Sequence, residues 1–257
     1  MTRGIFRPDG TSGERFFRWR GGDVSRLEGL ADAVFALALT LLVVRLEVPQ
    51  TFDEVRTALL RAPVYLACFA LFLWTWFCHY QFHRRYGLDD ALTVTLDGAI
   101  LFVVLMFALP LRFVADTILN SIQYGQPIVL DRAGQPVLGP SGEPLLALAT
   151  EDGSFLMFAY SGGFALVFAL FAIQTWNAFA RRERLQLDAL EVAVTRHTIL
   201  AHTASAVVGL LALVVTAVGS SLGGVVFFLM GPVHGVLGYL RGKRLTELAQ
   251  REGVIDA

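Results

Sequence analysis

The chain has 257 residues, of which 55% are hydrophobic and 17% are charged, with a formal net charge of −1 and a mean hydropathy of +0.58. Soluble domains carry about 25% charged residues, so this composition excludes a soluble protein and indicates an integral membrane protein. Cys68 and Cys78 lie ten residues apart in one apolar run, about 15 Å along a helix, which is too far for a disulfide. No Cys-x-x-Cys sequence occurs, which leaves no framework for an iron–sulfur cluster or a structural zinc ion.

Six apolar runs are candidates to cross a bilayer, which takes about 20 residues. They are predicted at residues 25–46, 58–82, 92–118, 154–178, 197–218 and 222–240. The first run contains an aspartate and no small-residue cleavage site, so we expect no cleavable signal peptide. Only the region around Gly219 separates the last two runs, which predicts a tight helical hairpin.

The connection between the third and fourth runs, residues 120–153, is long. It contains Gly-Gln-Pro twice, at 125–127 and 134–136, a pattern typical of a β-hairpin or a mobile loop. It has neither histidine nor cysteine, and we expect no catalytic role for it.

Basic residues are distributed unevenly between the two sides of this arrangement. One side carries sixteen arginines and lysines and the other carries five. Because basic residues are enriched on the cytoplasmic side of membrane proteins, both termini are predicted in the cytoplasm. The predicted fold is therefore an all-α integral membrane protein with six transmembrane helices. Its parts are a basic cytoplasmic N-terminus (1–24), a transmembrane domain (25–240) with an external loop at about 120–153, and a cytoplasmic C-terminus (241–257).

The first run carries a carboxylate, Asp32, inside an otherwise apolar stretch. An aspartate in the middle of a spanning helix costs roughly 2.5–3.5 kcal/mol of insertion free energy, so Asp32 predicts a functional or structural site. Counted from the cytoplasmic ends of their helices, His79, His202 and His234 are expected in the same layer as Asp32.

Three roles are open for this layer. In the first, Asp32 accepts hydrogen bonds from an imidazole, an indole or Arg26 and clamps the helices together, which is the interpretation we favour. The second is a proton relay or pH sensor, because histidine titrates near neutrality. The third is haem or metal ligation, for which His79 and His83 have i, i+4 spacing, although His83 is expected near the membrane surface.

A second pattern in the first run is a column of side chains at i, i+3, i+4 and i+7, formed by Leu37, Thr40, Leu41 and Val44. This spacing places them on one face of a helix, and Asp32 is about 140° away from Leu37 around the axis. Such a stripe usually packs against a neighbouring helix, and the spacing alone does not distinguish packing from the lining of a pore.

The segment RLEGLADAVFALALTLL, residues 26–42, resembles the first-helix signature of the transmembrane protein 175 potassium channel family. That signature has an arginine, three residues, Phe-Ser-Asp, a small residue paired with isoleucine or leucine, and Thr-Leu-Leu. Here Leu30-Ala31 replaces Phe-Ser and removes one hydroxyl, while the other positions are present. Further similarities are Pro49 after the helix, Trp76 and His79 in the second run, and Leu109-Pro110 in the third.

The resemblance implies a potassium-permeable cation channel rather than an enzyme, assembled as a homotetramer in a bacterial plasma membrane. It implies that the first helix of each subunit lines the pore, without the Thr-Val-Gly-Tyr-Gly filter of other potassium channels, which is absent here too. Carried over by position, Leu37 forms the first constriction ring, Thr40 a hydroxyl ring, and Leu41 and Val44 the rings above.

The resemblance further implies a clamp that fixes the first helix, formed by Arg26, Asp32, Trp76 and His79. It implies no cofactor and no bound metal. The implied partners are K⁺ and other monovalent cations, the lipid bilayer and three further copies of the chain, but not nucleic acid.

Two other interpretations of the sequence remain open. One is a membrane-embedded haem or redox protein that uses His79, His202 and His234. The other is a proton-coupled transporter, although no inverted repeat of broken helices is visible in the sequence.

Overall fold

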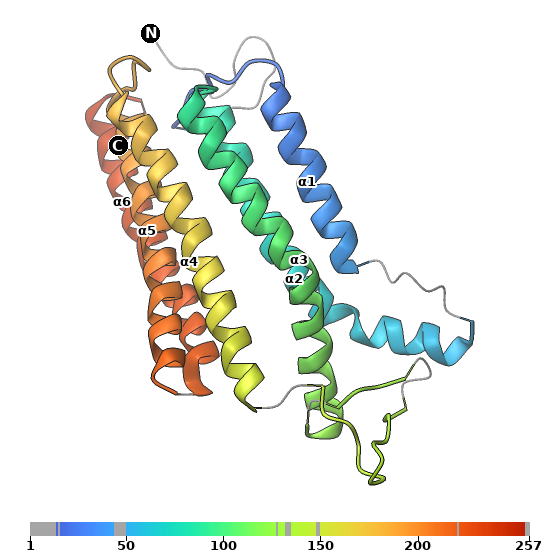
Figure 1. Ribbon diagram of the computed structural model, residues 1–257. Helices are drawn as coiled ribbons and strands as arrows, with labels where there is room; N and C mark the ends of the chain where they lie inside the picture. Colours follow the sequence, from blue (N-terminus) through green and yellow to red (C-terminus); the bar gives the residue numbers. More distant parts are fainter. Residues whose placement is uncertain are drawn as a thin grey trace.

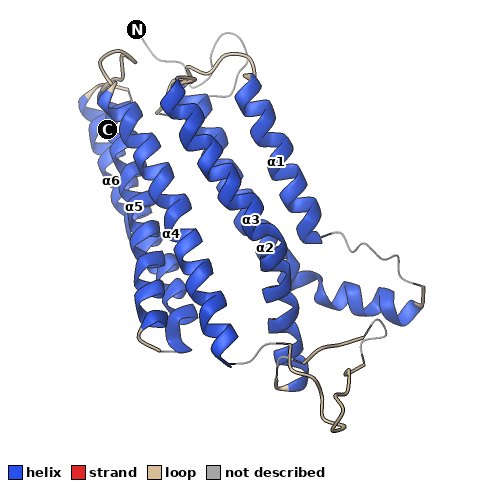
Figure 2. Cartoon of the chain, viewed as in Figure 1, coloured by secondary structure: helices blue, strands red, loops and turns tan. Residues whose placement is uncertain are grey.

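The computed structural model describes residues 14, 16–43, 50–126, 128–131, 135–147, 150–219 and 221–254. These residues form α1 (Arg26–Val43), α2 (Phe52–Tyr86), α3 (Ala91–Tyr124), α4 (Thr150–Ala180), α5 (Ala189–Ala217), the 3-10 helix η1 (Ser221–Leu229) and α6 (Met230–Arg251). The long helices lie side by side in a bundle (Figure 1), and no described segment is a β-strand (Figure 2). The start of α1 and the end of α6 lie at the same end of the bundle, which we call the terminal end.

Five helical segments of the described chain are long and apolar enough to cross a membrane. They are Phe52–Tyr86, Ala91–Tyr124, Asp152–Ala180, Ala189–Ala217 and Gly223–Arg251. α1 is not among them; its 18 residues include three charged side chains, Arg26, Glu28 and Asp32, and its length is about 27 Å. The prediction of an all-helical membrane protein is thus confirmed for the described residues, whereas the sixth span stays a prediction.

Capping residues extend several helices beyond the apolar runs found in the sequence. Thr51 accepts a hydrogen bond from the backbone of Glu54 at the start of α2, and Asp188 and Glu191 form a capping box at the start of α5. Such caps satisfy backbone N–H groups that lack partners in the first turn of a helix. Gly87 caps the C-terminus of α2, and its φ of 58° is left-handed and therefore favours glycine. The start of α5 thus lies at residue 189 rather than at the predicted 197.

α2 contains Pro63 and α3 contains Pro110 in the helix interior. Proline lacks the N–H that would bond to the carbonyl four residues earlier and clashes with that carbonyl, so it bends or breaks a helix. Figure 1 shows the first part of α2 turned away from the rest of that helix. The bend carries the amino end of α2 away from the bundle axis.

The apolar core has two parts, and small residues bring helices into close contact beside the first. The larger cluster joins α1, α2, α3, α4 and α5, and the smaller one joins the segment before α1 to the ends of α2, α4, α5 and α6. At Gly209 of α5, a Cβ atom would lie 3.0 Å from the Cβ of Ala165 on α4. Helices in lipid associate through such close packing because little apolar surface is removed from water there.

The loop between α3 and α4 is held by isolated antiparallel bridges: Ile128 with Leu146, Leu130 with Pro136, and Leu138 with Pro144. The amide of Asn120 on α3 donates a hydrogen bond of 2.9 Å to the carbonyl of Ile128. The region predicted as a hairpin or mobile loop is therefore shorter than 120–153, because α3 continues to Tyr124, and its ladder is too irregular to form strands. Its external position stays a prediction.

Candidate functional site

One face of α1 is packed against the rest of the subunit. α1 contacts α2 and α3 and no other described helix (Figure 1). The side chains that make this contact are fully buried, or nearly so: Ala31, Phe35, Ala38 and Leu42. Their spacing of four, three and four residues is that of a single helical stripe, so α1 is anchored along its described length by one face only.

The opposite face of α1 is uncovered in the single chain. Leu37 is 49% exposed, Thr40 is also exposed, and Leu41 is half-buried at the margin of this face. Val44, the fourth member of the predicted column, lies outside the described residues. We refer to Leu37, Thr40 and Leu41 as the open face of α1.

The hydroxyl of Thr40 has a defined orientation. Its Oγ1 donates a hydrogen bond of 2.7 Å to the carbonyl oxygen of Ala36, one turn earlier. A hydroxyl has one hydrogen and two lone pairs, so this bond uses the donor and leaves the oxygen able to accept. An exposed oxygen in this state suits a cation better than a hydroxyl whose hydrogen points outward.

Asp32 contacts α2. The indole Nε1 of Trp76 donates a hydrogen bond of 2.8 Å to Asp32 Oδ1, and the Trp76 ring stacks on Tyr80 with 5.5 Å between ring centroids. Asp32 itself is exposed in the single chain. The sequence predicts an imidazole, an indole or Arg26 as the donor to Asp32, and in the structure the indole of Trp76 is the donor.

A second contact between α1 and α2 lies one turn from Asp32. Arg84 donates to Glu28 Oε1 at 2.8 Å and to the carbonyl oxygen of Gly22 at 2.7 Å. Both partners in this ion pair are largely buried. Arg26, which the sequence suggested as the clamping arginine, is exposed and has no ion pair with Asp32. Arg84 of α2 therefore supplies an arginine contact to α1, and the role of Arg26 in the clamp stays a prediction.

His79 contacts both α1 and α3. Its ring lies 6.1 Å from the ring of Phe35 on α1, centroid to centroid. Its Nε2 lies 3.3 Å from Oδ1 of Asp97, and Nε2 of His83 lies 3.0 Å from Oδ2 of the same carboxylate. The amide of Gln174 on α4 donates to Asp97 Oδ1 at 2.7 Å. All four polar side chains are buried, so a single carboxylate joins α2, α3 and α4.

The other intramembrane histidines have different surroundings. His202 stacks on Phe171 with 5.4 Å between ring centroids, and Nε2 of His234 lies 2.9 Å from the hydroxyl of Ser205. Neither contacts Asp32, so the predicted layer of one aspartate and three histidines is not a single cluster. The donor atoms of His79, His83 and Asp97 lie within 4.8 Å of one another and have the chemistry of a metal site. His83 and Asp97 share a hydrogen bond, whereas Nε2 of His79 has no hydrogen-bond partner in the described part of the chain.

Polar contacts also join the segment before α1 to the bundle. Glu14 holds Arg85 at 2.8 Å and Arg20 pairs with Glu191 at 2.6 Å. Asp90, in the turn between α2 and α3, pairs with Arg181, which directly follows α4, at 2.7 Å. The hydrogen bond from Arg181 lowers the pKa of Asp90 to about 2. A carboxyl group with a lowered pKa contributes stability above its ordinary pKa and loses it as pH falls towards 2. This pair therefore remains formed at neutral pH.

Comparisons with known proteins agree on one family. A family model described as the endosomal/lysosomal potassium channel TMEM175 matches residues 26–108, which hold α1, α2 and half of α3. A protein of Marivirga tractuosa named as a potassium channel is 32% identical over 241 residues, which cover 91% of this chain and 94% of that protein. The chain belongs to the TMEM175 family.

A solved TMEM175 structure shares the fold. It is a crystal structure of a threonine-to-alanine variant of the potassium channel MtTMEM175 in complex with a nanobody–MBP fusion protein. The match has a TM-score of 0.70 and 30% sequence identity, and it covers 88% of this chain and 97% of that one. The resemblance found in the sequence of α1 is thus confirmed at the level of the family.

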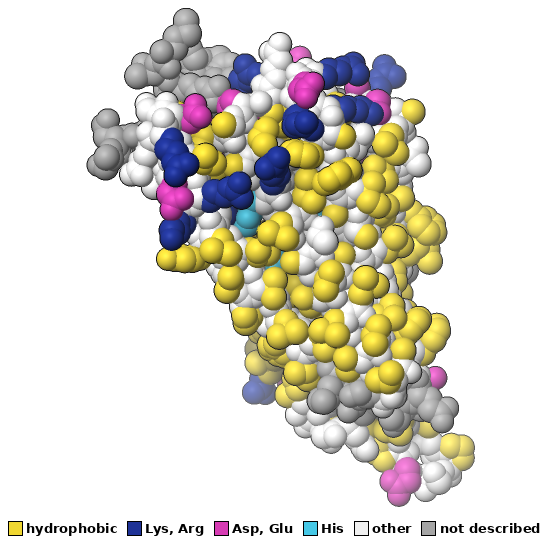
Figure 3. Space-filling view, turned by 90° about the vertical axis from the view of Figure 1, so that its left-hand side faces the viewer, with side chains coloured by type: hydrophobic (Ala, Val, Ile, Leu, Met, Phe, Trp, Pro, Cys, Tyr) yellow, Lys and Arg dark blue, Asp and Glu magenta, His cyan; other side chains and the backbone are white. Residues whose placement is uncertain are grey.

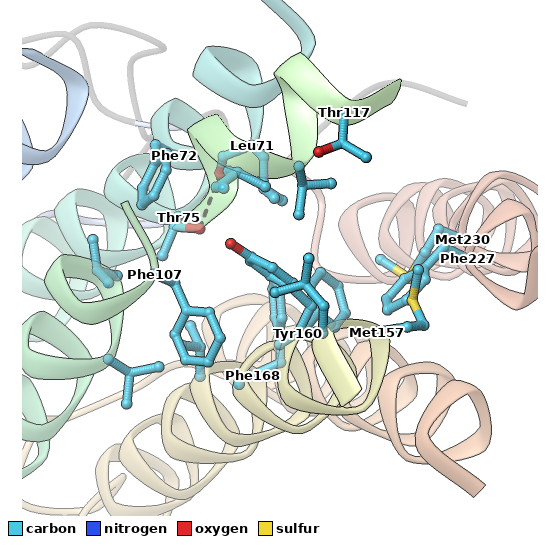
Figure 4. Close-up of a pocket in the computed structure, with 18 of the residues that line it drawn as sticks. Leu71, Phe72, Thr75, Phe107, Thr117, Met157, Tyr160, Phe168, Phe227 and Met230 are labelled. Atoms are coloured by element: carbon cyan, nitrogen blue, oxygen red, sulfur yellow. Dashed lines mark hydrogen bonds between the residues drawn. The ribbon is translucent and has the colours of Figure 1, made fainter. Parts of the chain in front are cut away.

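This TMEM175 chain also contains a large cavity that lies apart from α1. It has a volume of about 670 Å³ and is lined by α2, α3, α4, η1 and the start of α6. Among the described residues, its lining includes three polar side chains, of which Thr75 and Thr117 donate back to carbonyls of their own helices. The third, the hydroxyl of Tyr160, points into the cavity and has no hydrogen-bond partner (Figure 4). A cavity of this apolar character offers little to replace the hydration shell of an ion.

From the sequence, no site role is predicted for four residues that make these contacts: Glu28, Arg84, Asp97 and Gln174. Asp97 and Gln174 carried the same signal as Asp32, because each lies inside an apolar run. Glu28 and Arg84 carried none, because charged residues are ordinary at the ends of membrane helices.

Proposed function

We propose that this TMEM175 chain is the subunit of a homotetrameric, potassium-permeable cation channel whose pore is lined by the open face of α1. The observation that carries the proposal is that α1 packs on one face only and leaves Leu37 and Thr40 uncovered. One helix cannot enclose a pore, so several copies must bring their open faces together. The choice of K⁺ rests on the relatives, two of which are named as potassium channels.

The interior of one subunit gives no support to a different ion path. The large cavity is apolar and receives no side chain from α1. Moving an ion from water into such surroundings without compensating ligands is strongly unfavourable. The subunit interface is therefore the better place for the pore.

The open face of α1 has the chemistry that a hydrophobic gate and a weak selectivity ring require. We infer that four Leu37 side chains form the narrowest ring, that four Thr40 hydroxyls accept a partly dehydrated cation, and that Leu41 and Val44 form the rings above. Apolar constrictions can close a pore by excluding water. The bond from Thr40 to Ala36 supports this role because it turns the oxygen lone pairs away from the backbone.

We infer that α1 is the sixth membrane span and that both termini are cytoplasmic, in a bacterial plasma membrane. The charged groups of α1 lie in its first seven residues, where they reach the terminal end of the bundle. Most of the arginines and lysines lie on the side assigned to that end, as the distribution of basic residues in membrane proteins favours for a cytoplasmic surface.

Two contacts are suited to hold α1 while its open face lines a pore. They are the bond between Asp32 and Trp76 and the ion pair between Glu28 and Arg84. We propose that His79 supports this clamp by its ring contact with Phe35 of α1 and by fixing α2 to Asp97 on α3. Arg26 would then serve at the exposed start of α1, where a neighbouring subunit or lipid could meet it.

Assembly and transport are tested together on the purified full-length chain. Native mass spectrometry should give the mass of four copies, and liposomes that contain the protein should release K⁺ when a gradient is imposed. The proposal is overturned if the protein is a stable monomer and the liposomes still conduct, because a monomer would need an ion path within one subunit.

A further inference from the structure

A second, smaller pocket lies between α5 and α6 near the terminal end. Its volume is about 220 Å³. Four basic or titratable side chains line it, namely Arg196, His197, Arg241 and Arg244, together with Ala193 and the leucines Leu200, Leu237, Leu240 and Leu245. Figure 3 shows arginine and lysine side chains gathered near the upper end of this side of the molecule, with a histidine among them and a broad apolar surface below.

The three arginines of this pocket have no carboxylate partner among the described residues. Arg196 lies over the ring of Phe179, 5.3 Å from its centroid, rather than against an acid. Two acidic side chains of neighbouring segments are already engaged, since Glu14 holds Arg85 and Glu191 holds Arg20. Glu247 of α6 is exposed and does not line the pocket. Arg241 is half-buried, and a partly buried cation without a counter-charge is unfavourable. The pocket therefore has an excess of positive charge that an anion would balance.

The leucines of the pocket restrict what kind of anion fits. Leu200 is 52% exposed and Leu240 is 53% exposed, and both lie on helices long and apolar enough to cross a membrane. A ligand with an anionic head and hydrocarbon chains could place its head against the arginines and its chains along these leucines. A small, fully hydrated anion would leave the apolar part of the pocket unused.

We propose that this pocket binds the phosphate of an anionic phospholipid from the leaflet at the terminal end of the bundle. Guanidinium groups bind phosphate oxygens in pairs and remain charged at all physiological pH values. Basic pockets between membrane helices on the cytoplasmic side are suited to such headgroups. The site lies on α5 and α6, away from the open face of α1, so it does not depend on the proposed pore.

The test is binding of phosphatidylglycerol to the purified full-length protein in detergent. Its affinity is measured by thermal shift and by native mass spectrometry, with phosphatidylcholine as the neutral lipid. The double variant R241Q/R244Q removes two charges from the pocket. Its matched control, K243Q/R251Q, removes two charges from exposed positions of the same helix that do not line the pocket.

Each arginine near a membrane surface strengthens anion binding about fivefold, so R241Q/R244Q should weaken phosphatidylglycerol binding roughly 25-fold. The control should lose less than about threefold, and phosphatidylcholine should bind both variants alike. Equal loss in the two double variants would show general attraction to a basic surface and overturn the proposal.

Two further measurements keep the proposal open to refutation. If R241Q/R244Q does not fold, R196Q is used instead, with an expected loss of about fivefold. Inorganic phosphate and glycerol 1-phosphate are titrated in parallel with the lipid. If either stabilises the protein as strongly as phosphatidylglycerol at equal concentration, the pocket binds a soluble phosphate and the lipid assignment is wrong.

Discussion

Replacing Leu37 with alanine separates a pore-lining side chain from a packing side chain, and Leu42 provides the matched control on the same helix. Leu37 is 49% exposed in the single chain, whereas Leu42 is fully buried against the other helices. Full burial of a leucine side chain contributes about 1.5–3 kcal/mol, so the half that Leu37 buries contributes about 1 kcal/mol. A buried leucine shortened to alanine costs roughly 2–5 kcal/mol because it also leaves a cavity.

Each variant should therefore change the result of one assay and leave the result of the other close to that of the wild type. L37A should melt close to the wild type, and L42A should melt clearly earlier. In single-channel recordings L37A should conduct more and select less, because a wider and less apolar ring wets more easily. L42A should keep the conductance of the wild type in those channels that assemble.

The reverse pattern would refute the reasoning. If L37A melts as early as L42A and its channels conduct like the wild type, Leu37 is a packing residue. The open face of α1 would then contact another part of the assembly, and the pore would have to lie elsewhere.

Three further predictions concern other polar contacts of the chain. T40V keeps the side-chain shape and removes the hydroxyl, so the preference for K⁺ over Na⁺ should fall with little change in conductance; an unchanged preference in bi-ionic recordings would exclude a selectivity ring at Thr40. D32A and W76F should each weaken tetramer stability by roughly 1.5–3 kcal/mol, as expected for a hydrogen bond to a charged group, and the double variant should cost little more than either alone. Fully additive losses in denaturation would show that Asp32 and Trp76 act independently. D97N leaves His79 and His83 without their shared carboxylate and should cost roughly 3–5 kcal/mol, and a melting temperature equal to that of the wild type would argue against a structural role.

The features that could be predicted from the sequence are those set by periodicity and local chemistry. Long apolar runs fixed the positions of the helices, and the spacing of Leu37, Thr40 and Leu41 placed them on one face. Asp32 predicted a polar partner on another helix because a lone carboxylate in a membrane is costly, and the indole of Trp76 is such a partner.

Where several side chains could have met the same polar residue, the sequence could not predict which of them does so. Arg26 and Arg84 are both long, charged side chains near the same end of the bundle, and only the packing of α1 on α2 decides that Arg84 meets Glu28. The same limit applies to His79, whose ring meets Phe35 of α1 while its Nε2 lies against Asp97 of α3. Sequence periodicity gives the face of a residue on its own helix, whereas the rotation of neighbouring helices sets the contact.

The claim that the open face of α1 lines the ion path is tested most directly by thiol modification during K⁺ flux. Cys68 and Cys78 are the only cysteines of the chain and are first replaced by alanine. In this background L37C and, as the control on the packed face, F35C are placed in liposomes and treated with a small charged thiol reagent. We expect the reagent to stop K⁺ flux through L37C and to leave flux through F35C unchanged. Undiminished flux through L37C after mass spectrometry has shown complete modification would contradict the account.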